Sequence, residues 1–211
     1  MKQYFKLSSL LIVCLFLYAS ISIADQIDWD VIYQVDTLPH NHINWNINQE
    51  GYSELEVHNG LLFMDTTSAL KNFLFFERAW NADNKKGCIV EARLKLKDYI
   101  GSIGLGGCAI WVGDDLYEDV ILISKNQITL YASKISYEFP DSSFVSDFRI
   151  YRIETKKDDI LVYIDNQLVI DGRGQYGKNF SLPARNHIVF GDGSRGAGCI
   201  SVWDYIKYSI K

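Results

Sequence analysis

Apolar and charged residues alternate along residues 85–97, which read KKGCIVEARLKLK. The apolar side chains fall on one side of an extended chain and the charged ones on the other. The apolar set is Cys88, Val90, Ala92, Leu94 and Leu96, and the charged set is Glu91, Arg93, Lys95 and Lys97. Successive side chains of a β-strand point to opposite faces of its sheet. The alternation therefore predicts a strand with one face in a core and the other in water.

Short runs of the same kind recur through the rest of the chain, and no segment from Asp25 onward shows the periodicity of a helix. The runs cover residues 108–112, 120–124, 128–133, 148–155, 160–164 and 168–171. Residues typical of turns separate several of them, including Lys125-Asn126 and Asp165-Asn166. Parallel strands need long crossover connections, which are usually helices. The pattern therefore predicts an all-β fold, with two antiparallel sheets packed as a sandwich of the jelly-roll type.

A G-x-G-x-x-G pattern occurs near the end of the chain, at Gly191, Gly193 and Gly196. A dinucleotide-binding loop of this form needs a helix after it, because the helix N-terminus holds the pyrophosphate. The residues that follow Gly196, AGCISVW, are typical of a strand instead. The glycines are therefore interpreted as a loop between a strand at residues 188–190 and a final strand at residues 199–210.

The first 24 residues have the pattern of a secretory signal peptide. Lys2 and Lys6 precede an apolar stretch at residues 10–18, and Ala24 ends a short segment of small residues. An uncleaved membrane anchor is the alternative, but the apolar stretch is shorter than the roughly 20 residues that span a bilayer. The sequence therefore predicts cleavage after Ala24, one folded domain at residues 25–211, and a secreted or periplasmic location.

The net charge limits the expected binding partners, and the number of cysteines limits the possible disulfide bonds. Removing residues 1–24 removes two lysines and no acidic residue, so the formal charge changes from −5 to −7. With no basic stripe, neither nucleic acid nor an anionic membrane is an expected partner. An oxidising compartment permits disulfides. The predicted mature chain keeps Cys88, Cys108 and Cys199, so three unpaired thiols and one bridge with a remaining thiol are both open.

Three stretches resemble the concanavalin A-like lectin/glucanase superfamily, a group of jelly rolls that includes laminin-G-like modules and laminarinase-type glycosidases. They are FRIYRIETKKDDILVYIDNQLVIDG at residues 148–172, CIVEARLKLK at residues 88–97, and IVFGDGS with VWDYIKY near the C-terminus. Asn166 stands where the family usually has glycine. The likeness covers most of residues 45–210. It implies two curved sheets, and ligands lie across the concave face in relatives that act on sugars.

The sequence argues against the chemistry of the family's glycosidases. They carry E-x-D-x-x-E or E-x-D-x-E on one strand, and no glutamate of this chain is followed by aspartate two residues later. A serine nucleophile elbow, G-x-S-x-G, is also missing. His40 and His42 form a candidate zinc pair without an evident third ligand. His58 and His187 are interpreted as isolated structural histidines.

The resemblance also implies a structural calcium ion, which several relatives hold on the convex side. Those relatives use an aspartate of the last strand together with backbone carbonyls. Asp204 matches the aspartate, and Gly60 matches a turn that supplies a carbonyl; hard oxygen ligands of this kind suit calcium. A hydrogen bond from the neighbouring turn to Asp204 is the other interpretation, and both remain open.

Aromatic residues that face away from predicted core positions suggest a binding surface. Trp111 alternates with Ile110 and Val112, and Tyr131 follows Leu130 in the same way. By the same alternation, Tyr163 is expected on the face of its strand away from Val162. Tyr151 is expected on the face away from an inward-facing Ile150. Aromatic rings stack on sugar faces while neighbouring polar groups bond hydroxyls. The predicted ligand-binding residues are Trp111, Asp114, Asp115, Tyr131, Arg149, Tyr151, Arg152 and Tyr163; packing under loops is the alternative for each ring.

These features together predict a secreted, non-catalytic, lectin-like module that binds glycans or glycoconjugates. A polysaccharide hydrolase or lyase with a different set of catalytic residues is the first alternative. The second is an adhesion module that contacts protein, as laminin-G-like domains do. Fold alone does not separate these functions, because the superfamily contains all of them.

Overall fold

The computed structural model describes residues 27–42, 44–101, 107–141, 143–178, 183–193 and 196–211. The predicted signal segment, residues 1–24, lies outside the described residues. The described chain forms fifteen β-strands and two 3-10 helices, Pro39–Asn41 and Phe144–Ser146. Across these ranges no helix is long and apolar enough to span a bilayer. The strands are β1 (Val31–Gln34), β2 (Asn46–Glu50), β3 (Glu54–His58), β4 (Leu61–Asp65), β5 (Phe73–Ala79), β6 (Cys88–Gly101), β7 (Cys108–Gly113), β8 (Glu118–Ile123), β9 (Gln127–Leu130), β10 (Ser136–Glu138), β11 (Arg149–Lys156), β12 (Asp159–Ile164), β13 (Gln167–Gly172), β14 (His187–Asp192) and β15 (Ala197–Ile210).

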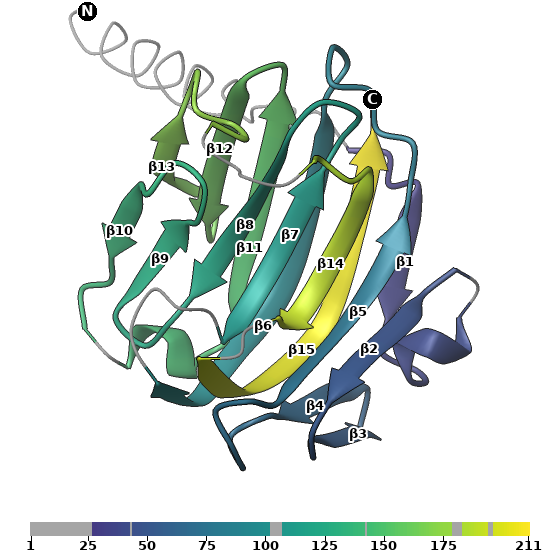
Figure 1. Ribbon diagram of the computed structural model, residues 1–211, viewed down its shortest axis with the longest axis vertical. Coiled ribbons are helices and arrows are strands. Elements are labelled where there is room, and N and C mark those ends of the chain that lie inside the picture. Colours follow the sequence, from purple (N-terminus) through teal and green to yellow (C-terminus); the bar gives the residue numbers. More distant parts are fainter. Residues whose placement is uncertain (1–26, 43, 102–106, 142, 179–182, 194–195) are drawn as a thin grey trace, which may run out of the picture.

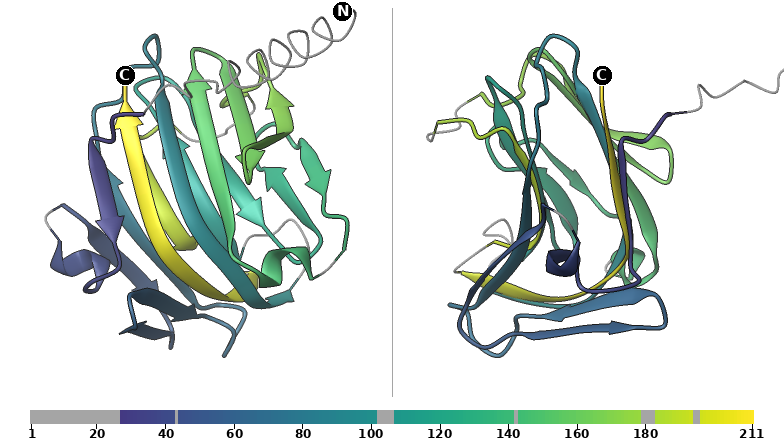
Figure 2. Two further views of the ribbon diagram at one scale, coloured as in Figure 1. Left: turned by 180° about the vertical axis from the view of Figure 1, so that it is seen from behind. Right: turned by 90° about the vertical axis from the view of Figure 1, so that its right-hand side faces the viewer.

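The strands form two sheets that pack face to face. The first, here called the convex sheet, has the order β13-β12-β11-β6-β15-β4-β3, and β1 also pairs with β15. The second, the concave sheet, has the order β10-β9-β8-β7-β14-β5-β2 and lies in front in Figure 1. Both sheets bend in the same sense, so that the outer face of the second sheet is hollow (Figure 2). The predicted antiparallel sandwich is confirmed.

The core lies between the sheets and follows the predicted alternation. Along β6, Val90, Ala92 and Leu94 are fully buried, whereas Arg93 and Lys95 between and after them are partly exposed. Large side chains from both sheets, including Phe190 and Trp203, meet there with ring centroids 5.0 Å apart. Each such side chain contributes on the order of 1.5–3 kcal/mol when it is fully removed from water. The sandwich is therefore held mainly by apolar burial from alternate strand positions.

The turn between β12 and β13 suits asparagine at position 166. Ile164 pairs with Gln167, so only Asp165 and Asn166 form the turn. Both have positive φ angles, 51° and 67°. Two-residue hairpin turns of the type I′ class need this conformation, and asparagine and aspartate tolerate it better than other residues with side chains. Asp165 and Asn166 are therefore compatible with a tight hairpin between β12 and β13.

The G-x-G-x-x-G pattern connects the two sheets. Gly191 lies in β14 of the concave sheet, and Gly196 immediately precedes β15 of the convex sheet. The segment after the third glycine is a strand of fourteen residues. The prediction of a strand after these glycines is confirmed, but Gly191 belongs to β14, so only Gly193 and Gly196 lie between the two strands.

One orientation predicted for β11 is wrong. Tyr151 is fully buried and points into the core, whereas Ile150 is only partly buried and lies on the opposite face. The register places Tyr151 directly across from Ala92 of β6. The small alanine leaves room for the phenol ring between the sheets. Tyr151 therefore cannot present its ring to a ligand at the surface.

Asp119 is a buried carboxylate next to this core. Its Oδ1 accepts hydrogen bonds from the backbone N–H groups of Val120, at 2.8 Å, and Ala132, at 2.9 Å. The side chain is fully buried. Desolvation raises the pKa of Asp119 to about 6, because burial disfavours the charged form.

Replacing Asp119 by asparagine is expected to remove a pH dependence of stability. Because the folded-state pKa is raised, stabilisation by the bound proton is fully present below the ordinary pKa of 3.8 and is lost as pH rises through about 6. The stability of the wild type relative to Asp119→Asn should therefore fall by about 3 kcal/mol between pH 3 and pH 7. Urea unfolding of both proteins across this range measures it. A difference that does not change with pH would refute the prediction.

Candidate functional site

The outer face of the concave sheet carries the side chains that alternate with the core positions of its strands. On β5, Leu74 and Phe76 enter the core, so Phe75 and Glu77 point outward. On β7, the neighbours of Trp111 are buried and its indole lies on the outer face, as predicted. The two strands flank β14. Side chains from strands distant in sequence therefore meet on this face.

Three aromatic rings form a continuous surface there, here called the aromatic platform (Phe73, Phe75 and Trp111). The Phe73 and Phe75 rings are stacked with centroids 5.6 Å apart, and Phe75 lies 5.4 Å from Trp111. Gly193, just after β14, makes room for the indole, because a Cβ atom there would lie 2.5 Å from Trp111 Cζ2. The position of the Trp111 ring therefore depends on Gly193, the second glycine of the G-x-G-x-x-G pattern.

Beside the platform, a buried histidine joins two carboxylates. His187 Nδ1 lies 2.6 Å from Glu77 Oε1, and His187 Nε2 lies 3.2 Å from Glu118 Oε1. The side chains of His187 and Glu118 are 3% and 0% exposed, whereas Glu77 is 29% exposed. His187 is a buried structural histidine, as predicted, but it is not isolated, because both of its ring nitrogens contact carboxylates.

Arg185 completes this charge network. Its backbone N–H donates to Glu118 Oε2 at 3.0 Å, and its Nη2 donates to Oε1 at 3.2 Å. Burial acts to raise the pKa of Glu118, but the hydrogen bonds and charges of His187 and Arg185 outweigh it and hold that pKa below its usual value. Glu118 is therefore an enclosed carboxylate that holds both His187 and Arg185 in place.

The exposed part of the network borders the platform. The Arg185 guanidinium lies 5.5 Å from the centroid of the Trp111 ring, and its side chain is 48% exposed. Asn48 Nδ2 donates to Glu77 Oε2 at 3.4 Å. The concave-face cluster, meaning the platform with Glu77, Glu118, His187, Arg185 and Asn48, thus offers flat apolar rings beside hydrogen-bond donors and acceptors. Such a surface can stack on one face of a ligand while it bonds polar groups at the ligand's rim.

The other residues predicted to bind a ligand do not join this cluster. Tyr131 follows β9 on the same side of the concave sheet, with its side chain 45% exposed. Asp114 is buried in the turn after β7, where it accepts hydrogen bonds from Asn84 and from the backbone of Tyr117. Asp115 accepts a hydrogen bond from the Asn84 backbone at 2.8 Å. These two aspartates therefore hold the turn.

The remaining predicted residues lie on the convex sheet. The Arg152 guanidinium lies 4.4 Å from the centroid of the Tyr163 ring. Arg149 donates to the Phe144 carbonyl at 2.9 Å and to Asp165 at 3.0 Å. With Tyr151 in the core, the eight predicted residues do not form one surface. Only Trp111 belongs to the concave-face cluster.

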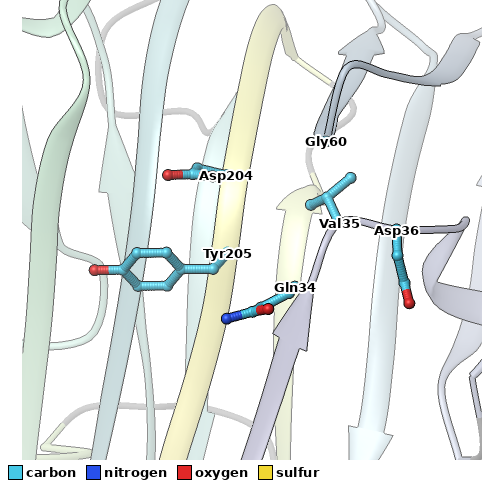
Figure 3. Close-up of a pocket in the computed structure, with 6 residues that line it drawn as sticks. All are labelled: Gln34, Val35, Asp36, Gly60, Asp204 and Tyr205. Atoms are coloured by element: carbon cyan, nitrogen blue, oxygen red, sulfur yellow. The ribbon is translucent and has the colours of Figure 1, made fainter.

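The predicted metal residues do line one pocket, of about 420 Å³. Asp204 and Gly60 lie there with Gln34, Val35, Asp36 and Tyr205 (Figure 3). The carboxylates of Asp204 and Asp36 point away from Gly60, and Asp204 is ion-paired with Arg93 of the neighbouring strand. In the described part of the chain, no three His, Cys, Asp or Glu side chains are grouped to hold a metal. A calcium ion here would therefore compete with Arg93 for the Asp204 carboxylate.

The candidate zinc pair is also separated. His42 Nε2 lies 2.9 Å from Asp36 Oδ1 and 3.0 Å from Thr37 Oγ1. His40 instead stacks on Phe76, with ring centroids 6.0 Å apart. Each imidazole therefore has a structural contact of its own.

The two curved antiparallel sheets and their strand order define a concanavalin A-like jelly roll. Solved structures with this fold include a carbohydrate esterase from Shiga toxin-encoding bacteriophage phi24B, which is 13% identical, has a TM-score of 0.61, and matches 87% of this chain and 99% of its own. A laminarinase from Flavobacterium sp. UMI-01 is 15% identical with a TM-score of 0.58, over 86% and 99% of the two chains. The carbohydrate recognition domain of Emp46p is 12% identical with a TM-score of 0.52, over 86% and 98%. No family model and no curated protein sequence matches the chain. At these identities the likeness establishes the fold.

Proposed function

We propose that this protein is a secreted, non-catalytic module that binds a glycan on the outer face of its concave sheet. The observation that carries the proposal is the aromatic platform beside Glu77, Asn48 and Arg185. Sugar rings have apolar faces that stack on aromatic side chains, and hydroxyl groups at their rims that bond carboxylates, amides and guanidinium groups. The Trp111 indole supplies a surface for stacking, and the exposed part of the Glu77 carboxylate supplies a hydrogen-bond acceptor.

The similar structures support a glycan as the partner. The bacteriophage esterase, the laminarinase and the Emp46p domain are each named for carbohydrate. The predicted signal segment supports secretion. A formal charge of −7 for the predicted mature chain does not favour nucleic acid or an anionic membrane.

The burial of Glu118 supports binding without hydrolysis. Glycoside hydrolysis generally needs two carboxyl groups that both reach the scissile bond or its attacking water. Within the concave-face cluster, only Glu77 is accessible, since the Glu118 side chain is 0% exposed and fully bonded to His187 and Arg185.

A broad glycan array probed with the purified chain tests this function. Binding to a defined set of glycans, without release of sugar from the ligands bound, is the expected result. Turnover of a bound glycan would favour the hydrolase or lyase alternative. Binding to a protein partner that survives enzymatic removal of its glycans, with no array signal, would favour the adhesion alternative.

Calcium binding is a separate prediction, which the glycan-binding proposal does not need. It would require the Asp204 carboxylate to leave its ion pair with Arg93. Thermal unfolding with and without calcium tests it in the wild type, in Asp204→Asn and in Asp98→Asn. Asp98 is a matched control, as a surface carboxylate 2.7 Å from Lys125 Nζ. Calcium at about 100 times its Kd would stabilise the protein by about 2.7 kcal/mol. A rise in Tm lost only in Asp204→Asn would support the site, and an unchanged wild-type Tm would refute it.

A further inference from the structure

We propose that Cys108 and Cys199 form a disulfide that joins the two sheets, while Cys88 stays a thiol. Cys108 begins β7 in the concave sheet, and Cys199 is the third residue of β15 in the convex sheet. Both side chains are buried in the same core cluster. The proposal concerns the covalent structure and does not depend on the glycan-binding function.

A hydrogen-bonded bridge between the sheets places the two cysteines beside each other. Cys108 is the direct neighbour of Asp192 across the β7–β14 pair. The Thr66 hydroxyl donates to the Asp192 carboxylate and accepts the backbone N–H of Cys199 at 2.9 Å. Asp192, which is paired with Cys108, therefore contacts Thr66, which is hydrogen-bonded to Cys199. This contact crosses the core at the level of the two cysteines.

The sheets also approach each other at this end of the sandwich. Packed sheets usually lie about 10 Å apart, but Cα atoms of β7 and β15 come within 8 Å. The beginning of β15 bends toward the concave sheet, as the right-hand view of Figure 2 shows. The neighbouring Cys108 thiol and burial raise the pKa of the Cys199 thiol well above its usual value. Disulfides need Cα atoms roughly 4.4–6.8 Å apart, and the close approach of β7 and β15 brings the two strands near this range.

Cys88 lies too far away to compete. Along the β6–β15 pair, Cys199 is opposite Tyr99 and Cys88 is opposite Ile210. Eleven residues of β6 separate Cys88 from Tyr99, which is roughly 36 Å along a strand. The Cys88 Sγ is instead 3.1 Å from Thr155 Oγ1. Of the three pairings, the structure permits only Cys108 with Cys199.

Oxidised glutathione, a small disulfide of oxidising compartments, supplies the oxidant. One cysteine, deprotonated to its thiolate, attacks the glutathione disulfide, forms a mixed disulfide and releases one glutathione thiolate. The second thiolate attacks the cysteine sulfur of that mixed disulfide and releases the other glutathione. The protein loses two protons and two electrons, and two reduced glutathione molecules form. Because both side chains are buried in the folded state, the exchange takes place before the sheets close.

Peptide mapping of the full chain tests the pairing. The protein is refolded from denaturant with oxidised glutathione, its thiols are then alkylated in denaturant without reductant, and peptides are identified by mass. The expected product has Cys108 linked to Cys199 and an alkylated Cys88. Alkylation of both Cys108 and Cys199, or any linkage to Cys88, would overturn the proposal.

Thermal unfolding provides a second readout. The bond closes a loop of about ninety residues, for which chain-entropy estimates predict a fall in Tm of about 10 °C on reduction. Cys88→Ser should keep this fall, and Cys108→Ala should lose it. A fall of the same size in Cys108→Ala, or its loss in Cys88→Ser, would contradict the pairing. If Cys108→Ala does not fold, the peptide map decides.

Discussion

Trp111→Ala is expected to weaken glycan binding by about 30- to 100-fold. The indole is the ring of the aromatic platform that contacts both Phe75 and Arg185, at 5.4 Å and 5.5 Å between the groups. Its removal takes away the stacking surface and frees Arg185 to move. Loss of a stacked aromatic contact with its buried area costs about 2–3 kcal/mol, and each 1.4 kcal/mol is a factor of about ten in Kd. Titration calorimetry with a glycan identified on the array measures the change.

Tyr163→Ala is the matched control for this prediction. Tyr163 is also a partly buried aromatic residue on a sheet surface with a guanidinium over its ring, that of Arg152 at 4.4 Å, but it lies on the convex sheet. Its replacement should change Kd by less than threefold, a difference under about 0.7 kcal/mol. If Tyr163→Ala weakened binding and Trp111→Ala did not, the ligand would lie on the other sheet. Equal Tm values for both variants would exclude unfolding as the cause.

Glu118→Ala is expected to lower the free energy of unfolding by about 3–5 kcal/mol, the range for breaking a buried ion pair by removing one partner. Glu118 holds His187 through Nε2 and Arg185 through both backbone and side chain. Without it, the nearly buried His187 loses one of its two carboxylates. Urea unfolding at pH 7 measures the loss.

Two further measurements separate this effect from a general loss of charge. Glu154→Ala removes a carboxylate that pairs with Arg152 at 3.1 Å on the convex sheet, with 31% of its side chain exposed, and should cost under about 1 kcal/mol. The folded-state pKa of Glu118 lies below its ordinary value of 4.5. Its stabilisation is therefore complete above that value and lost as pH falls through the lowered pKa. An effect of Glu118→Ala no larger than that of Glu154→Ala would contradict the role of Glu118.

The strands could be predicted because apolar and charged residues alternate with a period of two along the sequence. The alternation from Cys88 to Leu96 appears in the structure as buried and exposed positions of β6. It also placed Trp111 on the outer face of β7. The prediction failed at Tyr151 because it placed Ile150 inward, whereas Tyr151 shares its parity with the buried Ile153 and alternates with Arg152.

The candidate site could not be predicted because its residues meet through strand register. A search along single strands for the E-x-D-x-E or E-x-D-x-x-E motif finds none. The carboxylates of the site instead come from two strands, Glu77 on β5 and Glu118 on β8, with β14 and β7 between them. His187 joins the two only because β14 pairs with both β5 and β7. Register depends on turns, bulges and the packing of the opposite sheet, which no single segment encodes.

Nuclear magnetic resonance of the ¹⁵N-labelled protein, titrated with the glycan that binds best on the array, would locate the ligand. We expect the largest shifts at the Trp111 indole N–H and at backbone amides of β5, β7 and β14, with the amides of β11 and β12 unchanged. Shifts confined to the convex sheet, at Tyr163 and its neighbours, would contradict a glycan site on the concave face.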